Sequence, residues 1–125
     1  MIFRIIGQDG KEAEVKLPGH YVIGRIGNNV VLFKGGRDAM TTDEILQPIA
    51  ELEDGDDSVA DNHLDVIVDA ESLRLRDKNT LGGSYFYPYP NERARRFTGR
   101  EIKVTESGEY GLQIGVLRVP IIYEK

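Results

Sequence analysis

The sequence predicts an all-β fold, a sandwich of short, mainly antiparallel strands, for three reasons. Apolar residues recur with a period of two in several segments, which is the period of half-buried strands. Turn-forming combinations of Gly, Asn, Asp, Pro and Ser separate these segments at short intervals. The chain has 125 residues, which is enough for one such domain over residues 1–125 and leaves little room for a second.

The expected strands follow one another along the chain. The alternating segments are, in order, EVKL at 14–17, HLDVIV at 63–68, LRLRD at 73–77 and EYGLQIGVLRVPIIYEK at 109–125, and the apolar run YVI at 21–23 is a further strand. Pro120 in the last segment indicates an edge strand or a bulge, because proline has no N–H for a ladder hydrogen bond.

One segment, TTDEILQPIAELEDGDD at 41–57, lacks the period of two. Its apolar residues recur at helical spacing from Ile45 to Leu52, after a threonine and two acids suited to a helix start. We therefore expect a short helix near residues 42–52, with Pro48 restricting where it begins.

The composition excludes several classes of site. Without cysteine the chain has no disulfide, thiolate metal site or cysteine nucleophile, and a cytoplasmic location is favoured. The sequence has no secretory signal at its start and no apolar run long enough for a bilayer, so no membrane partner is expected. A net charge of -5 argues against nucleic acid. No metal or other cofactor is expected.

The charge is unevenly distributed. Residues 41–71 contain eleven Asp and Glu and no Lys or Arg, whereas residues 72–125 contain ten basic and six acidic residues. Such an acidic segment attracts a basic partner, or is a solvated loop that recognises nothing.

Three short stretches are expected to meet at one end of the sandwich. In YVIGRIGNN, Arg25 follows a strand and Gly24 lets the backbone bend. In SVADNHLDVIVD, His63 stands where an acidic loop becomes a strand, and KNTLGGSYF is a loop rich in backbone donors and small hydroxyl side chains.

The order of these stretches resembles that of the forkhead-associated (FHA) domain, a β-sandwich whose loops bind phosphothreonine peptides. The resemblance extends from about Val15 to Val116 and includes FTGREIKV at 97–104. The family's Gly-Arg is matched by Gly24 and Arg25. Its Ser-Arg-x-His is met by Ala60, Asp61, Asn62 and His63, and its Asp-x-x-Ser-x-Asn-Gly-Thr by Asp77, Thr80, Gly82, Gly83 and Ser84.

The resemblance implies a role for each of these positions. Gly24 and His63 would be structural. If phosphopeptide binding is retained, the binding residues would be Arg25, Ser58, Thr80, Gly82 and Gly83.

Three departures from the family pattern predict that phosphothreonine recognition is degenerate. Ala60 has no hydroxyl for the phosphate, Asp61 has the wrong charge beside it, and Gly82 replaces an asparagine. Ser58 is a candidate substitute for the missing serine, although it lies two residues further from His63. Arg25 either binds an anion or pairs with an internal acid such as Asp61, which would fill the pocket.

The segment GGSYFYPYPNERARRF at 82–97 is a candidate protein interface, because Tyr and Arg anchor many interfaces. Its candidate residues are Tyr85, Tyr87, Tyr89, Arg93, Arg95 and Arg96. Alternatively, the aromatic residues pack on the sandwich and the arginines are solvated. The acidic and basic segments could also meet, within one chain or between copies.

These observations predict an FHA-like protein-interaction module with degenerate phosphothreonine recognition, acting as a scaffold or assembly component. Its partner would be a protein, phosphothreonine-containing or basic, or another copy of the chain. The alternative is a functional phosphothreonine-peptide-binding signalling domain. An enzyme is not expected, because the sequence offers no nucleophile with a base and no metal-ligand set.

Overall fold

The computed structural model describes residues 1–35, 45–88 and 93–125, apart from the side chains of residues 45 and 46. The strands of the first sheet are β1 (Ile2–Ile6), β2 (Glu12–Val15), β8 (Ser84–Tyr87), β9 (Arg95–Arg96), β11 (Gly108–Ile114) and β12 (Leu117–Glu124). Those of the second sheet are β3 (Gly19–Ile26), β4 (Asn29–Lys34), β5 (Ile45–Glu51), β6 (Asn62–Val68), β7 (Leu73–Asp77) and β10 (Glu101–Val104).

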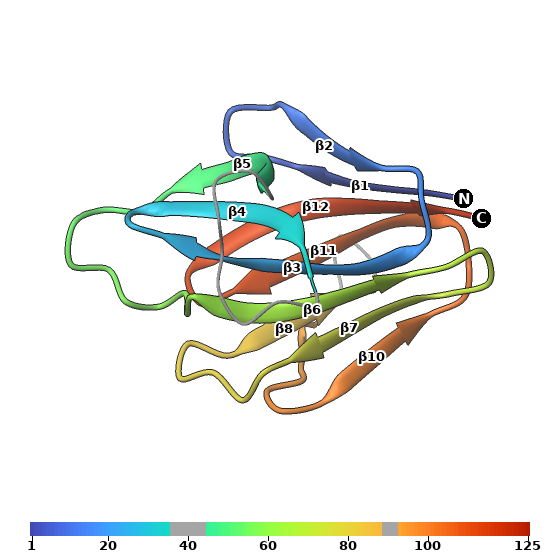
Figure 1. The fold of residues 1–125 in the computed structure, drawn as a ribbon. Helices are drawn as coiled ribbons and strands as arrows, with labels where there is room; N and C mark the ends of the chain where they lie inside the picture. The colour runs from blue at the N-terminus through green and yellow to red at the C-terminus, as the bar shows by residue number, and fades with distance from the viewer. Residues whose placement is uncertain (36–44, 89–92) are drawn as a thin grey trace.

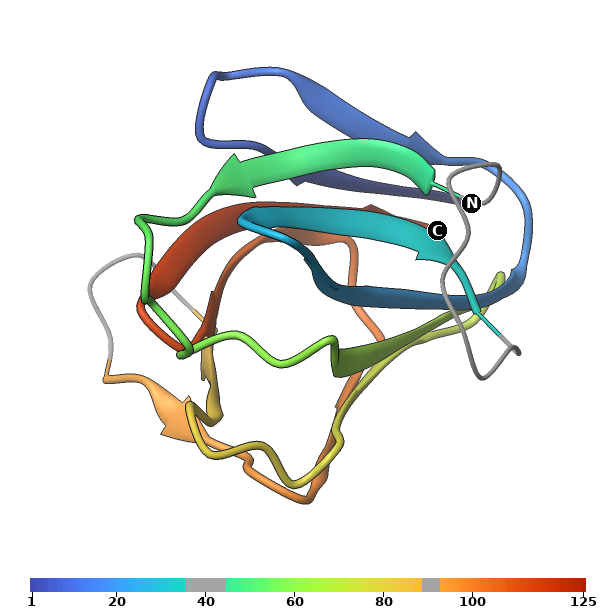
Figure 2. The ribbon, with the colours of Figure 1, turned by 60° about the vertical axis from the view of Figure 1, so that its left-hand side comes forward.

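The strands form a two-layered sandwich (Figures 1 and 2), which confirms the predicted fold class. The strand order is β2-β1-β12-β11-β8-β9 in the first sheet and β10-β7-β6-β3-β4-β5 in the second. Neighbouring strands pair antiparallel in both sheets. The described residues include no helix, and so none that could cross a membrane.

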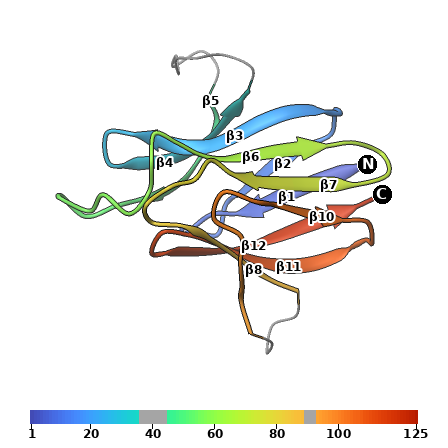
Figure 3. The same ribbon diagram turned by 90° about the horizontal axis from the view of Figure 1, so that it is seen from below.

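The core lies between the two layers. In Figure 3, β3, β4, β6 and β7 of the second sheet lie above β8, β11 and β12 of the first. Strand β12 illustrates how alternation builds the core: Leu117, Val119 and Ile121 are buried, while Arg118 and Pro120 between them are exposed. Because successive side chains of a strand point to opposite faces, the apolar half of each strand reaches the core.

The helix expected near residues 42–52 is wrong over residues 45–51, which form β5; residues 42–44 lie outside the described residues. Strand β5 pairs with β4, and the register shifts twice along this pair. Ile49 and Leu52 are buried in the core, so the apolar spacing that suggested a helix serves an irregular strand instead. Pairing with β4 outweighs the local preference, and Pro48 is tolerated because β5 is an edge strand.

The position of Pro120 also corrects an expectation. Its strand, β12, lies between β1 and β11 and not at an edge, and its pairing shows no bulge. Pairing with β1 stops at Ile121, one residue before Pro120 is reached. The missing N–H therefore costs no hydrogen bond to β1.

The outermost strand at each edge of the two sheets carries charge or proline. These residues are Glu12 and Glu14 in β2, Arg95 and Arg96 in β9, Pro48 in β5, and Glu101 and Lys103 in β10.

Four connections lie together at the end of the sandwich opposite the chain termini (Figure 1). They are residues 27–28 between β3 and β4, residues 52–61 between β5 and β6, residues 78–83 between β7 and β8, and residues 115–116 between β11 and β12. We call this region the loop end and residues 52–61 the acidic loop.

Candidate functional site

Gly24 allows the acidic loop to cross the end of β3. The backbone N–H of Arg25 donates to the Asp61 carbonyl at 3.1 Å, and a Cβ atom on Gly24 would lie 1.9 Å from that same oxygen. Any side chain at position 24 would push the two segments apart. Arg25 was expected to follow the strand, but it lies within β3 and pairs with Val30.

The guanidinium of Arg25 is bound to its own chain. Its Nε donates to the Gly27 carbonyl at 2.5 Å, its Nη1 to the Asp56 carbonyl, and its Nη2 to Asn28 Oδ1 at 3.2 Å. The sequence suggested Asp61 as the internal partner, but the bonds go to the β3–β4 turn and to a backbone carbonyl of the acidic loop. Arg25 thereby ties these two connections together.

Asp56 stabilises the turn of the acidic loop that Arg25 grips. Its carboxylate accepts the backbone N–H of Ser58 at 2.9 Å. The backbone and side-chain hydrogen bonds from Ser58 lower the pKa of Asp56, and the positive charge of Arg25 adds to this effect.

His63 is fully buried and joins three backbone segments. Its Nδ1 accepts the backbone N–H of Ala60 at 3.0 Å, so its proton is on Nε2, which lies 2.8 Å from the Gly83 carbonyl. Burial lowers the pKa of His63, although the Gly83 carbonyl and the nearby Asp77 charge oppose that shift. The ring is therefore neutral at pH 7, with both nitrogens occupied.

Asp77 holds the β7–β8 loop in place. Its carboxylate accepts the Ser84 hydroxyl at 2.5 Å, the Gly99 N–H at 2.9 Å, and both the N–H and the hydroxyl of Thr80, at 3.0 and 2.8 Å. Burial acts to raise the pKa of Asp77, but these hydrogen bonds outweigh it and the pKa is lowered. The Thr80 hydroxyl also lies 3.0 Å from Nε2 of His63, so it is engaged by two side chains of the protein.

The carbonyl of Ser58 fills the space beside Gly82. A Cβ atom at position 82 would lie 1.8 Å from this oxygen, and one at Gly115 would lie 2.3 Å from it. The Ser58 hydroxyl accepts the backbone N–H of Val116 at 3.3 Å. The acidic loop is thus packed onto both the β7–β8 loop and the β11–β12 turn.

The loop end exposes two apolar side chains and several carboxylates. Leu81 and Val116 are 103% and 67% exposed, and their glycine neighbours, Gly82 and Gly115, lie against each other. Asp57 and Asp61 are exposed in the adjacent acidic loop. Sequence reasoning missed Leu81 and Val116, because only the fold brings two exposed apolar residues from distant segments together.

The candidate interface residues lie on different elements of the first sheet. Tyr85 and Tyr87 point outward from β8, and Arg96 is the partner of Tyr85 in β9. Arg93 and Arg95 are exposed, and Tyr89 lies outside the described residues. The sequence did not single out Arg118, whose guanidinium carbon lies 3.9 Å from the centre of the Tyr87 ring.

The described residues contain no cluster of three or more His, Cys, Asp or Glu that could hold a metal ion. No family model matches the sequence, and no curated protein matches it closely enough to count as a relative.

Solved structures, however, share the fold of this chain. The FhaA FHA domain, solved in complex with the intracellular domain of Rv3910, matches with a TM-score of 0.50 and 18% identity, over 97% of this chain and 96% of that one. An FHA domain from work on phosphothreonine-dependent FHA domain interactions matches with a TM-score of 0.55 and 16% identity, over 99% and 96% of the two chains. The FHA domain of CT664 from Chlamydia trachomatis matches with a TM-score of 0.55 and 11% identity, over 99% and 97%. The chain has an FHA-like fold.

Proposed function

Starting from this FHA-like fold, we propose that the chain is a protein-interaction module whose loop end binds a protein partner without phosphothreonine, as part of a scaffold or assembly. The observation that carries the proposal is the internal use of Arg25. Its guanidinium donates to Gly27, Asp56 and Asn28, so the cation expected to meet a phosphate already holds the acidic loop.

The rest of the loop end supports this proposal. Ala60 offers no hydroxyl, and its N–H is taken by His63. The Thr80 hydroxyl donates to Asp77, and the Ser58 carbonyl occupies the space that a side chain at position 82 would need. A phosphate with nearly two negative charges would in addition face the exposed carboxylate of Asp61.

The surface that remains fits a partner with apolar and basic groups. Leu81 and Val116 are exposed apolar side chains, and the carboxylates of Asp57 and Asp61 lie in the neighbouring loop. Exposed apolar groups with charges around them are typical of binding surfaces.

The same bonds support a non-enzymatic role. Both ring nitrogens of His63, the buried histidine of the loop end, are engaged by Ala60 and Gly83, so it has no free nitrogen to act as a base.

One observation favours a second candidate function, the phosphothreonine reader. Arg25 is half-exposed and has five N–H donors, of which the three hydrogen bonds take one each. Two donors are left for an anion. In that case Arg25, Ser58, Thr80 and the backbone of Gly82 and Gly83 would form the pocket.

A peptide titration separates the two functions. The full chain is titrated with a phosphothreonine peptide library and with the same library unphosphorylated, alongside the Arg25→Ala variant. We expect no gain in affinity from phosphate, in either protein. Micromolar binding that needs the phosphate and disappears in Arg25→Ala would establish the reader and refute the proposal.

A further inference from the structure

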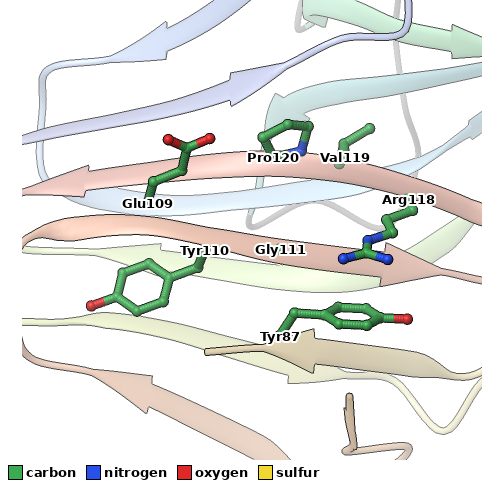
Figure 4. Close-up of a pocket in the computed structure, with 7 residues that line it drawn as sticks. All are labelled: Tyr87, Glu109, Tyr110, Gly111, Arg118, Val119 and Pro120. Atoms are coloured by element: carbon green, nitrogen blue, oxygen red, sulfur yellow. The ribbon is translucent and has the colours of Figure 1, made fainter. Parts of the chain in front are cut away.

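The outer face of the first sheet has a hollow of about 350 Å³ over β8, β11 and β12 (Figure 4). Gly111 forms its floor, directly opposite Tyr87 in the strand register, and a Cβ atom on Gly111 would lie 2.9 Å from the Tyr87 Cβ. Pro120 and Arg118 border the hollow from β12, and Glu109 stands at the end away from Arg118. The hollow exists because position 111 has no side chain.

Two arginines on this face lie over tyrosine rings. The guanidinium carbon of Arg118 is 3.9 Å from the centre of the Tyr87 ring, and that of Arg96 is 6.0 Å from the centre of the Tyr85 ring. Both arginines are exposed. We call these four residues the tyrosine–arginine face.

The charges of this face are not neutralised by the described part of the chain. The ion pairs of the described residues involve neither Arg96 nor Arg118. A guanidinium already stacked on an aromatic ring loses little freedom when it binds a carboxylate, and it can do so through two parallel hydrogen bonds.

The loop end has the complementary pattern. The acidic loop contains no Lys or Arg, and the exposed carboxylates of Glu53, Asp57 and Asp61 form no ion pair with a described Lys, Arg or His. The exposed Leu81 and Val116 are the chain neighbours of Gly82 and Gly115, which pack against Ser58 of the acidic loop. One surface thus has apolar side chains next to carboxylates, and the other has an aromatic hollow next to arginines.

The two surfaces do not meet within one chain. The acidic loop is held in place by the bond from Arg25 to the Asp56 carbonyl and by the contacts of Ser58 with Gly82 and Gly115. The surfaces are nevertheless neighbours, because Val116 belongs to the loop end and Arg118 to the tyrosine–arginine face. A two-fold axis near the β11–β12 turn would place each acidic loop against the face of the other copy.

We infer that the chain forms a two-fold dimer in which the tyrosine–arginine face of each copy binds the acidic loop of the other. This inference rests on the proposed role as a protein-interaction module and names one partner, a second copy. The two proposals can fail separately. The dimer is tested by the molecular mass of the chain in solution, and the proposed function is tested by the affinity for phosphorylated and unphosphorylated peptides.

The test is sedimentation equilibrium of the full chain at low salt, about 0.02 M, and at high salt, about 0.5 M. We expect a dimer at low salt that dissociates at high salt. Two double variants reverse the charges: Arg96→Glu with Arg118→Glu, and Asp57→Lys with Asp61→Lys. Each alone should lose at least about tenfold in association constant, because its changed surface repels the unchanged one. An equimolar mixture of the two should dimerise again, since opposite charges then face each other.

The matched control is Lys16→Glu with Lys103→Glu, which changes net charge as much as the arginine variant does but on other surfaces. It should dimerise nearly as well as the unaltered chain. A chain that is monomeric at high concentration and low salt would overturn the inference. So would a mixture of the two charge-reversed variants that stays monomeric, or a control variant that dissociates as fully as the arginine variant.

Discussion

The carbonyl oxygen of Ser58 lies 1.8 Å from the position that a Cβ atom on Gly82 would take. At the position where the FHA pattern has an asparagine, this chain has backbone from another loop. The space for a ligand-gripping side chain is therefore occupied by the protein itself. Gly82 and the acidic loop form one packed unit, and neither can be changed alone.

This relationship predicts a large cost for a single methyl group. Gly82→Ala should lower the free energy of unfolding by about 1–3 kcal/mol, because the loop must move away from β8 to admit the Cβ. Gly19→Ala is the matched control: its Cβ would have only ordinary contacts, at 3.6 Å or more. Urea unfolding of both variants checks this, and equal stabilities would show that the loop gives way freely.

Arg25→Ala should loosen the acidic loop without unfolding the sandwich. The lost hydrogen bonds run from Arg25 to the Asp56 carbonyl of the acidic loop and to the β3–β4 turn, whereas the strands keep their ladders. Hydrogen exchange followed by NMR should show faster exchange at the amides of Asp56 and Ser58 and unchanged exchange at Ile23 in β3. If those two amides exchange at the original rate, the guanidinium does not hold the loop.

The buried His63 predicts a loss of stability in mild acid. Its pKa in the folded chain is lowered from 6.5, so the unfolded chain binds the extra proton more readily. The contribution of the neutral His63 to the free energy of unfolding is complete above pH 6.5. It is lost as the pH falls through the lowered pKa of the folded chain. Urea unfolding between pH 8 and pH 5 measures this slope, and NMR of the imidazole gives the pKa directly. A folded-state pKa at or above 6.5 would contradict the prediction.

Asp77→Asn should be more damaging than a surface change of the same kind. The carboxylate accepts four hydrogen bonds, from Ser84, Gly99 and Thr80, and an amide cannot accept them all. The expected loss is at least about 2 kcal/mol, since hydrogen bonds to charged groups are worth about 1.5–3 kcal/mol each. Asp9→Asn is the control, because Asp9 lies at an exposed turn where its carboxylate accepts one hydrogen bond from the Lys11 N–H. It should lower the free energy of unfolding by less than about 1 kcal/mol.

The same carboxylate extends the acid sensitivity to lower pH. The pKa of Asp77 is lowered from 3.8 in the folded chain, so its contribution is complete above that value and is lost as pH falls below it. Asp77→Asn should therefore flatten the stability curve below pH 4. Because the Asp77 charge opposes the lowering of the His63 pKa, its removal should also extend the His63 slope to lower pH. Thermal unfolding of both proteins across this pH range distinguishes the contribution of Asp77 to stability from that of His63.

The sequence predicted the strands that show a period of two, and it did not single out β4, whose four consecutive apolar residues are all buried. HLDVIV and LRLRD became β6 and β7, whereas Arg25, expected to follow a strand, lies within β3. The segment from Ile45 to Leu52 was misread because a strand with register shifts loses its period of two. Only pairing with β4 decides its conformation, and that pairing is not visible in the local sequence.

The sequence named residues that the structure brings together at the loop end, but it did not show their contacts. The motif order named Arg25, Ser58 and Gly82, but no pattern shows that the first binds a carbonyl or that the second packs on the third. Arg118 escaped notice because a single arginine in an alternating strand has no signal of its own. Its contact with Tyr87 is diagonal across β11, because Arg118 pairs with Gln113 whereas Tyr87 pairs with Gly111.

The edge strands limit how copies of this chain can associate. An exposed sheet edge invites pairing with another chain, and such pairing grows into aggregates. Here β5 has Pro48 without an N–H, and β2, β9 and β10 carry charged side chains. Association is thereby directed to side-chain surfaces, where it can stop at a defined size. The same edges should keep the protein from aggregating at concentrations that a weak dimer needs.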